Sequence, residues 1–183
     1  ILGCPSGRSL KNTYKFIGII SYRQNVDLSN VKIFMMDEFV TINKSKKYEL
    51  CDKIKHYSCA AYSKNVIKKF FNYKKIKKKK LLDSNIFIPN VSSPKSYDRK
   101  IKSSGGIDIF LLASGSSDGH VAFNNIKPRI NSLTHITKLS DKTRKDNMKT
   151  FSDFTSIKQV PKYGITVGLG TIHKLSKTGI LVL

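Results

Sequence analysis

Residues 107–120 run Ile107-Asp108-Ile109-Phe110-Leu111-Leu112-Ala113-Ser114-Gly115-Ser116-Ser117-Asp118-Gly119-His120, an apolar segment followed by a polar loop. The apolar segment has the length and residue types of a buried strand. In open α/β sheets, ligands bind outside the carboxyl ends of the strands. The loop places a carboxylate, Asp118, two residues before an imidazole, His120, at such an end. Because histidine exchanges protons near neutral pH, both are candidate site residues.

Similar apolar runs alternate with helical patterns along the rest of the chain. The spacing of apolar residues and the helix stop and start signals predict helices at 10–22, 62–71, 93–102 and 141–149. Extended segments are predicted at 1–4, 31–36, 85–89, 107–113, 133–139, 163–168 and 179–183. This alternation favours parallel βαβ units and therefore an α/β fold with a parallel sheet.

The length of 183 residues suits one domain with a sizeable core. Within that single domain, 1–183, the polar and lysine-rich segments 41–61 and 72–84 are interpreted as surface insertions or loops. The chain lacks an initiator methionine and ends in a strand pattern, so we expect a fragment truncated at both ends.

The composition limits the classes of binding partner and the cellular compartment that we expect. The absence of an apolar run of about 18 residues argues against a transmembrane helix and a membrane partner. The formal charge of +22 invites a nucleic-acid interpretation, but the densest cluster, Lys74–Lys80, follows a predicted helix end and has lysines as its only cations. A solvated loop is therefore favoured over a nucleic-acid site. Cys4, Cys51 and Cys59 are an odd number without metal-ligand spacing, which indicates a reducing, cytoplasmic compartment.

Two further loops follow predicted strands. In Pro5-Ser6-Gly7-Arg8-Ser9, small residues, hydroxyls and a following helix could hold a phosphate, although a capped helix start explains the pattern equally well. In Asp37-Glu38, two acids after an apolar strand could supply a proton-transferring base, but alone they are better explained as helix caps. Together, the three loops suggest proton chemistry on a phosphorylated small molecule.

Four ordered motifs resemble the glucosamine-6-phosphate deaminase family. They are Leu2-Gly3-Cys4-Pro5-Ser6-Gly7, Phe34-Met35-Met36-Asp37-Glu38-Phe39-Val40, Asp118-Gly119-His120-Val121-Ala122-Phe123-Asn124 and Val160-Pro161-Lys162-Tyr163-Gly164-Ile165-Thr166-Val167-Gly168-Leu169-Gly170-Thr171. Any one of them is weak, whereas four in this order are specific. The resemblance spans nearly all of the chain, apart from an apparent insertion within 41–61.

The resemblance implies a Rossmann-like three-layer sandwich with a mostly parallel central sheet. It also implies conversion of glucosamine 6-phosphate to fructose 6-phosphate and ammonia, without a metal or other cofactor, and a possible homo-oligomer. Asp37 matches the family base that moves a proton between C1 and C2 of the sugar. His120 matches the group that opens the sugar ring, with Asp118 supporting it.

The same resemblance assigns the phosphate site. Ser6, Gly7, Arg8 and Ser9 match the phosphate-binding turn of the family. Lys149 stands where the family has an arginine, so the charge is retained but the bidentate fork is lost.

Other positions depart from the family pattern. Asn125 stands where the family has the glutamate that completes the ring-opening triad, and it supplies no carboxylate charge. The family's Gly-Gly-x-Gly stretch is replaced by Ala113-Ser114-Gly115-Ser116, whose added side chains are expected to crowd the substrate. The basic pair that binds an activator in hexameric relatives is replaced by His135 and Thr137.

Two alternatives remain open on these residues. The Asp-Gly-His loop also suits a 6-phosphogluconolactonase, which has a related fold and hydrolyses a sugar-phosphate lactone. Asn125, the lost glycines and the lysine excess also suit a catalytically degenerate sugar-phosphate-binding protein or a basic binding module.

Overall fold

The computed structural model describes residues 1–115, 118–125, 129–151 and 153–182. Its strands are β1 (Leu2–Cys4), β2 (Ile33–Met35), β3 (Asp37–Ile42), β4 (Tyr48–Leu50), β5 (Ile86–Phe87), β6 (Ile107–Ala113), β7 (His135–Lys138), β8 (Tyr163–Thr166) and β9 (Ser176–Val182). Its α-helices are α1 (Lys11–Arg23), α2 (Cys59–Tyr62), α3 (Lys69–Phe71), α4 (Pro94–Ser103), α5 (Asp141–Thr150) and α6 (Leu169–Leu175). A π-helical segment, η1 (Ser63–Lys68), joins α2 to α3, and 3₁₀ turns lie at η2 (Lys77–Lys79), η3 (Asp83–Asn85) and η4 (Ile157–Gln159).

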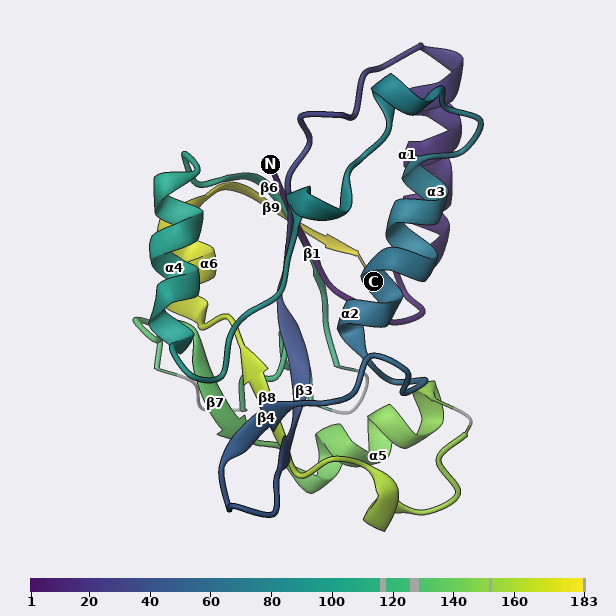
Figure 1. The fold of residues 1–183 in the computed structure, drawn as a ribbon. Coiled ribbons are helices and arrows are strands. Elements are labelled where there is room, and N and C mark those ends of the chain that lie inside the picture. Colours follow the sequence, from purple (N-terminus) through teal and green to yellow (C-terminus); the bar gives the residue numbers. More distant parts are fainter. Residues whose placement is uncertain (116–117, 126–128, 152, 183) are drawn as a thin grey trace.

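A five-stranded parallel sheet in the order β5-β2-β1-β6-β9 forms the centre of the molecule. Helices α1 and α3 cover one face, and α4 and α6 cover the other, which makes three layers (Figure 1). The residues of β2 alternate between the two faces, because Ile33 and Met35 pack with the α1 side of the core and Phe34 packs with the α4 side. The expected three-layer α/β fold with a parallel central sheet is confirmed.

A second sheet, in the order β4-β3-β8-β7, is antiparallel and was not expected from the alternation of elements. The chain passes from the first sheet to the second at Met36. The Met36 N–H donates to the carbonyl of Cys4 in the parallel sheet, at 3.1 Å, and its carbonyl accepts from the N–H of Val167, at 2.8 Å. Asp37 therefore begins a strand, and the interpretation of Asp37-Glu38 as a loop is wrong.

The helical segment predicted at 62–71 begins earlier, at Cys59. The Ser58 side chain accepts from the N–H of Ala61 and caps this helix. Ser58 and Cys59 are buried, so the end of the 41–61 segment is not a surface loop. The reason is a long-range one, because these residues pack against the carboxylates of β3.

The lysine-rich segment 72–84 is partly anchored to the end of α1. Lys75 is buried, and its Nζ donates to the carbonyls of Ser21 and Val26, at 3.1 and 2.5 Å. Nζ of Lys79 donates to Oδ1 of Asn25 at 2.6 Å. Two of these lysines therefore have structural partners within the chain.

Across the described part of the chain, every helix is too short or too polar to span a bilayer. The strand predicted at 179–183 is the second half of β9, and Leu183 lies outside the described residues.

Candidate active site

A cavity of about 270 Å³ opens where the carboxyl ends of β1 and β6 meet the start of β3, beside α5. It is lined by Pro5, Ser6, Gly7, Arg8, Ser9, Met36, Asp37, Phe39, Ala113, Ser114, Gly115, His120, Ala122, Phe123, Asp146, Asn147, Lys149, Thr150 and Phe151. Residues of all three segments singled out in the sequence, the turn Ser6–Ser9, Asp37 and His120, thus contribute to one cavity. Its position agrees with the rule that ligands bind at the carboxyl ends of parallel strands.

The turn after β1 is held in place through its carbonyl groups. The hydroxyl of Tyr14 donates to the carbonyl of Pro5 at 2.7 Å, and the hydroxyl of Tyr62 donates to the carbonyl of Gly7 at 2.6 Å. Burial raises the pKa of Tyr62 to about 12, so this phenol remains a donor at neutral pH. Gly7 adopts a φ of 99°, a conformation that favours glycine. The turn therefore has a fixed shape, with the exposed side chain of Arg8 at its edge.

Asp37 presents a buried carboxyl to the cavity. Burial, together with the neighbouring charge of Glu38, raises its pKa to about 7, although a hydrogen bond from the Cys59 thiol acts in the opposite direction. The Sγ–Oδ1 distance of that bond is 3.4 Å. A carboxyl group that titrates near neutral pH is suited to accept and return a proton.

Glu38 is fully buried and has a different role. Its carboxylate accepts from the N–H groups of Cys59 and Ala60, at 2.9 and 2.7 Å, and from the hydroxyl of Ser58 at 3.0 Å. It therefore satisfies the free N–H groups at the start of α2. The helix-cap explanation holds for Glu38, and Asp37 is the acid that faces the cavity.

Asp118 and His120 form a close pair in the loop after β6. Nδ1 of His120 lies 2.5 Å from Oδ1 of Asp118, which also accepts from the His120 N–H at 3.2 Å. Burial acts to raise the pKa of Asp118, but the hydrogen bonds and the charge of His120 hold this pKa below its ordinary value. The carboxylate fixes the orientation of the ring.

Gly115 makes room for the imidazole of His120. A Cβ added to Gly115 would lie 2.2 Å from the ring atoms Cε1 and Nδ1. The Gly115 N–H also donates to the His120 carbonyl at 2.7 Å, which closes the loop. The glycine that this ring position requires is thus retained, while Ser116 and Ser117 lie outside the described residues.

The strands of the second sheet connect Asp37 with the loop of His120. Asp37 pairs with Thr166 in the register of β3 and β8. Oγ1 of Thr166 accepts from the N–H of Phe123, at 3.1 Å, three residues beyond His120. Asp37 and the His120 loop are therefore both attached to the end of β8.

Comparison with known proteins places this geometry in a family. No model of a known protein family matches the chain. The glucosamine-6-phosphate deaminase of Clostridium beijerinckii is 31% identical over 192 residues, which cover 100% of this chain and 69% of that protein. The enzyme of the same name from Mycoplasma mycoides subsp. mycoides SC is 33% identical, over 99% of this chain and 67% of that protein. The chain belongs to the glucosamine-6-phosphate deaminase family.

Solved structures agree with this assignment. The structure of a monomeric glucosamine-6-phosphate deaminase matches with a TM-score of 0.75 and 26% identity, over 98% of this chain and 68% of that one. A 6-phosphogluconolactonase from Trypanosoma cruzi matches with a TM-score of 0.64 and 15% identity, over 98% of this chain and 66% of that one, which shows a shared fold. The chain spans about two thirds of the length of these relatives.

The two residues that depart from the family pattern, Lys149 and Asn125, line different cavities. Lys149 is exposed on α5 and lines the same cavity as the turn after β1. Asn125 is exposed, and its Nδ2 donates to Oγ1 of Thr137 at 3.2 Å. It lines a smaller cavity together with Asp118 and His120, on the side of Asn124 and Leu169. The Asn125 amide is therefore bonded to Thr137 on β7.

Sequence reasoning missed two side chains of the deaminase-like site. Cys59 lies between Asp37 and Ser6, with a distance of 3.1 Å between its Sγ and Oγ of Ser6. Asp146 comes from α5 and lines the cavity beside His120. Cys59 was hidden in a segment without clear periodicity, and Asp146 was one charge among many on a polar helix.

One group of side chains in the described residues is compact enough to hold a cation. Polar atoms of Asp118, His120 and Asp146 all lie within 4.8 Å of one another. Because Nδ1 of His120 is already held by Asp118, we assign no metal to this group. The expectation that the site uses neither a metal nor another cofactor stays a prediction.

Proposed function

We propose that this chain converts glucosamine 6-phosphate and water to fructose 6-phosphate and ammonia. The observation that carries the proposal is the shared cavity of Asp37, His120 and the turn Ser6–Ser9. It combines a carboxyl group whose pKa is about 7, an imidazole held by a carboxylate, and a turn suited to an anion. Membership of the deaminase family supports the same reaction.

The phosphate of the sugar binds at one end of the cavity. The hydroxyls of Ser6 and Ser9 and the backbone of Gly7 are its donors in the turn, and Arg8 and Lys149 supply positive charge. Binding the phosphate there orients C1 and C2 toward Asp37, which gives the reaction its near-attack geometry.

His120 acts first, on the closed sugar ring. It accepts the proton of the C1 hydroxyl and returns a proton to the ring oxygen, so that the C1–O5 bond breaks and a free aldehyde forms. Asp118 keeps the imidazole oriented and stabilises its protonated form during this step.

Asp37 acts next, as the base of the isomerisation. It removes the proton from C2 while a proton of the C2 ammonium group moves to the C1 oxygen, which gives an enolamine. It then returns its proton to C1, which leaves an iminium group at C2. Water then adds to C2 and ammonia leaves, which yields the ketone. A pKa near 7 allows Asp37 both to take and to return the proton at neutral pH.

The second candidate is lactone hydrolysis of the 6-phosphogluconolactonase type. The Asp118–His120 pair suits it, because an imidazole held by a carboxylate can activate water. A buried acid with a raised pKa is the feature that favours isomerisation over it.

A coupled assay for ammonia and fructose 6-phosphate tests the proposal. We expect turnover by the purified chain and a loss of about 10²–10⁴-fold in kcat for Asp37→Asn. Asp52→Asn, a change of an exposed acid outside the cavity, serves as the matched control and should retain activity. Hydrolysis of 6-phosphogluconolactone without ammonia release would favour the second candidate, and tight phosphosugar binding without turnover would favour a binding protein.

The cellular compartment and the oligomeric state of the enzyme are part of the same proposal. The three buried cysteines are free thiols, which supports a reducing, cytoplasmic compartment. A homo-oligomer is proposed on the family resemblance, and light scattering of the purified chain measures it.

A further inference from the structure

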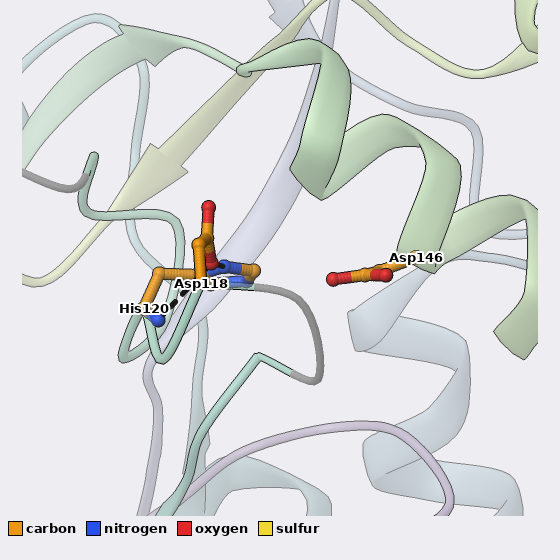
Figure 2. A group of neighbouring side chains, drawn as sticks. All are labelled: Asp118, His120 and Asp146. Atoms are coloured by element: carbon orange, nitrogen blue, oxygen red, sulfur yellow. Dashed lines mark hydrogen bonds and ion pairs between the residues drawn. The ribbon is translucent and has the colours of Figure 1, made fainter.

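Asp146 directs a carboxylate at the Asp118–His120 pair from a different part of the chain. It lies on α5, and Figure 2 shows its side chain reaching from the helix toward the imidazole. One carboxylate oxygen of Asp146 lies within 4.8 Å of both a ring nitrogen of His120 and an oxygen of Asp118. Asp146 and His120 also line the same cavity. The imidazole thus has one acid in hydrogen-bond contact and a second one nearby.

We propose that Asp146 is a positioning residue that stabilises the protonated form of His120 during ring opening. The inference rests on the proposed function, and it adds to it a second carboxylate that acts on the imidazole across space. Asp118 orients the ring through Nδ1, whereas Asp146 contributes charge from the neighbouring helix.

The separation is short enough for an electrostatic effect. The ligand atoms of Asp146 and His120 lie within 4.8 Å of each other, and an opposite charge within about 4–6 Å favours an imidazolium. His120 is only 11% exposed in its side chain, so solvent screens the interaction less than at the surface.

Other charges around the cavity act on the same imidazole. Among the described lining residues, Asp37 on β3 is the remaining acid, and Arg8 after β1 and Lys149 on α5 are the cations besides His120. The two cations oppose protonation of His120, which makes a second carboxylate more useful there. Asn125 does not supply that charge, since its amide is neutral and is bonded to Thr137.

The experiment is an NMR titration of His120 in the full chain and in Asp146→Asn. The chain has four histidines, so His120→Gln assigns the resonance. We expect the pKa of His120 to fall by about half a unit or more in Asp146→Asn, because a charge at this distance is removed. Asp141→Asn, the same chemical change on the exposed first turn of α5, is the matched control and should leave the His120 titration in place.

Activity gives a second readout. If the chain is a deaminase, Asp146→Asn should move the His120 limb of the kcat/KM profile by the same amount as the NMR titration, and KM should change less than kcat. An unchanged His120 pKa in a folded Asp146→Asn protein overturns the inference. A shifted pKa in a chain without deaminase activity supports the electrostatic link and contradicts the proposed function instead. Restoration of Asp146→Asn by a divalent cation, or dependence of the native chain on one, also overturns the inference.

Discussion

The thiol of Cys59 donates to the carboxylate of Asp37 across 3.4 Å, and its sulfur lies 3.1 Å from the hydroxyl of Ser6. One buried side chain therefore connects Asp37 with the turn Ser6–Ser9. Both partners of Cys59 line the cavity. This connection gives the first of four predictions.

Replacing Cys59 by alanine should change the pH dependence of catalysis. The thiol stabilises the ionised form of Asp37, so its loss should raise the pKa of Asp37 above about 7. We expect the acidic limb of the kcat/KM profile to move upward by about half to one pH unit. Cys59→Ser keeps a donor and should not show this upward move. Equal profiles for Cys59→Ala and the native chain would exclude the connection.

Asp37→Asn should lower the activity and raise the free energy of unfolding, and the gain in stability should depend on pH. Burial raises the pKa of Asp37 from 3.8 to about 7, so the folded state retains a proton that the unfolded state releases. The stability linked to this proton is present below about pH 4 and is lost as the pH rises through about 7. Asparagine resembles the protonated acid, and at pH 8 the variant should be more stable by up to about 4 kcal/mol.

Urea unfolding of both proteins measures this difference. The gain in unfolding free energy should shrink toward zero as the pH is lowered from 8 to 4. A gain that is constant over this range would show that Asp37 does not titrate as its burial implies.

Gly115→Ala should displace the imidazole of His120 although the titratable residues of the site are all retained. The new Cβ would lie 2.2 Å from the His120 ring, so the ring must move away from Asp118. We expect kcat to fall by about 10²-fold or more, with the fold retained by circular dichroism. Gly179→Ala on β9 is the control, because its Cβ would meet Leu112 at an ordinary 3.4 Å. Comparable losses in both variants would argue against a specific role of Gly115.

Lys149→Ala should weaken binding of the phosphosugar more than the chemical step. A charge-assisted contact with phosphate contributes about 1.5–3 kcal/mol, so KM should rise by about 10- to 100-fold. Lys149→Arg should retain the native KM or lower it, because a guanidinium binds phosphate in a bidentate manner. Lys145→Ala, an exposed lysine on the same helix outside the cavity lining, is the control. A fall in kcat with an unchanged KM would contradict the assignment of Lys149 to phosphate binding.

Local patterns in the sequence were sufficient for most single elements. The apolar run 107–113 is β6 with the same bounds, and the helix predicted at 141–149 is α5 extended by Thr150. Periodicity reveals such elements because each buries one face, or both, against the core. Asp37, Asp118 and His120 were also visible, since Asp37 directly follows an apolar run and the other two lie in the polar loop after the next one.

The partners of those residues were not visible, and the helix cap formed by Glu38 is an example. Its carboxylate meets N–H groups more than 20 positions away, at Cys59 and Ala60. No local pattern distinguishes it from Asp37, the adjacent acid, and the antiparallel second sheet that separates their roles is equally non-local. Asn125 is a further example, because its amide donates to Thr137, twelve positions away.

By itself, the amino-acid sequence determined the α/β class, the central parallel strands, and the strand-end residues that a phosphosugar enzyme requires. Only the tertiary structure decided which acid faces the cavity, that Cys59 connects it to Ser6, and that Asp146 rather than Asn125 brings a second carboxylate near His120. The physical reason is that alternation and helical spacing report burial along one segment. Hydrogen bonds and charge interactions in the site join segments whose distance depends on how the two sheets and α5 pack.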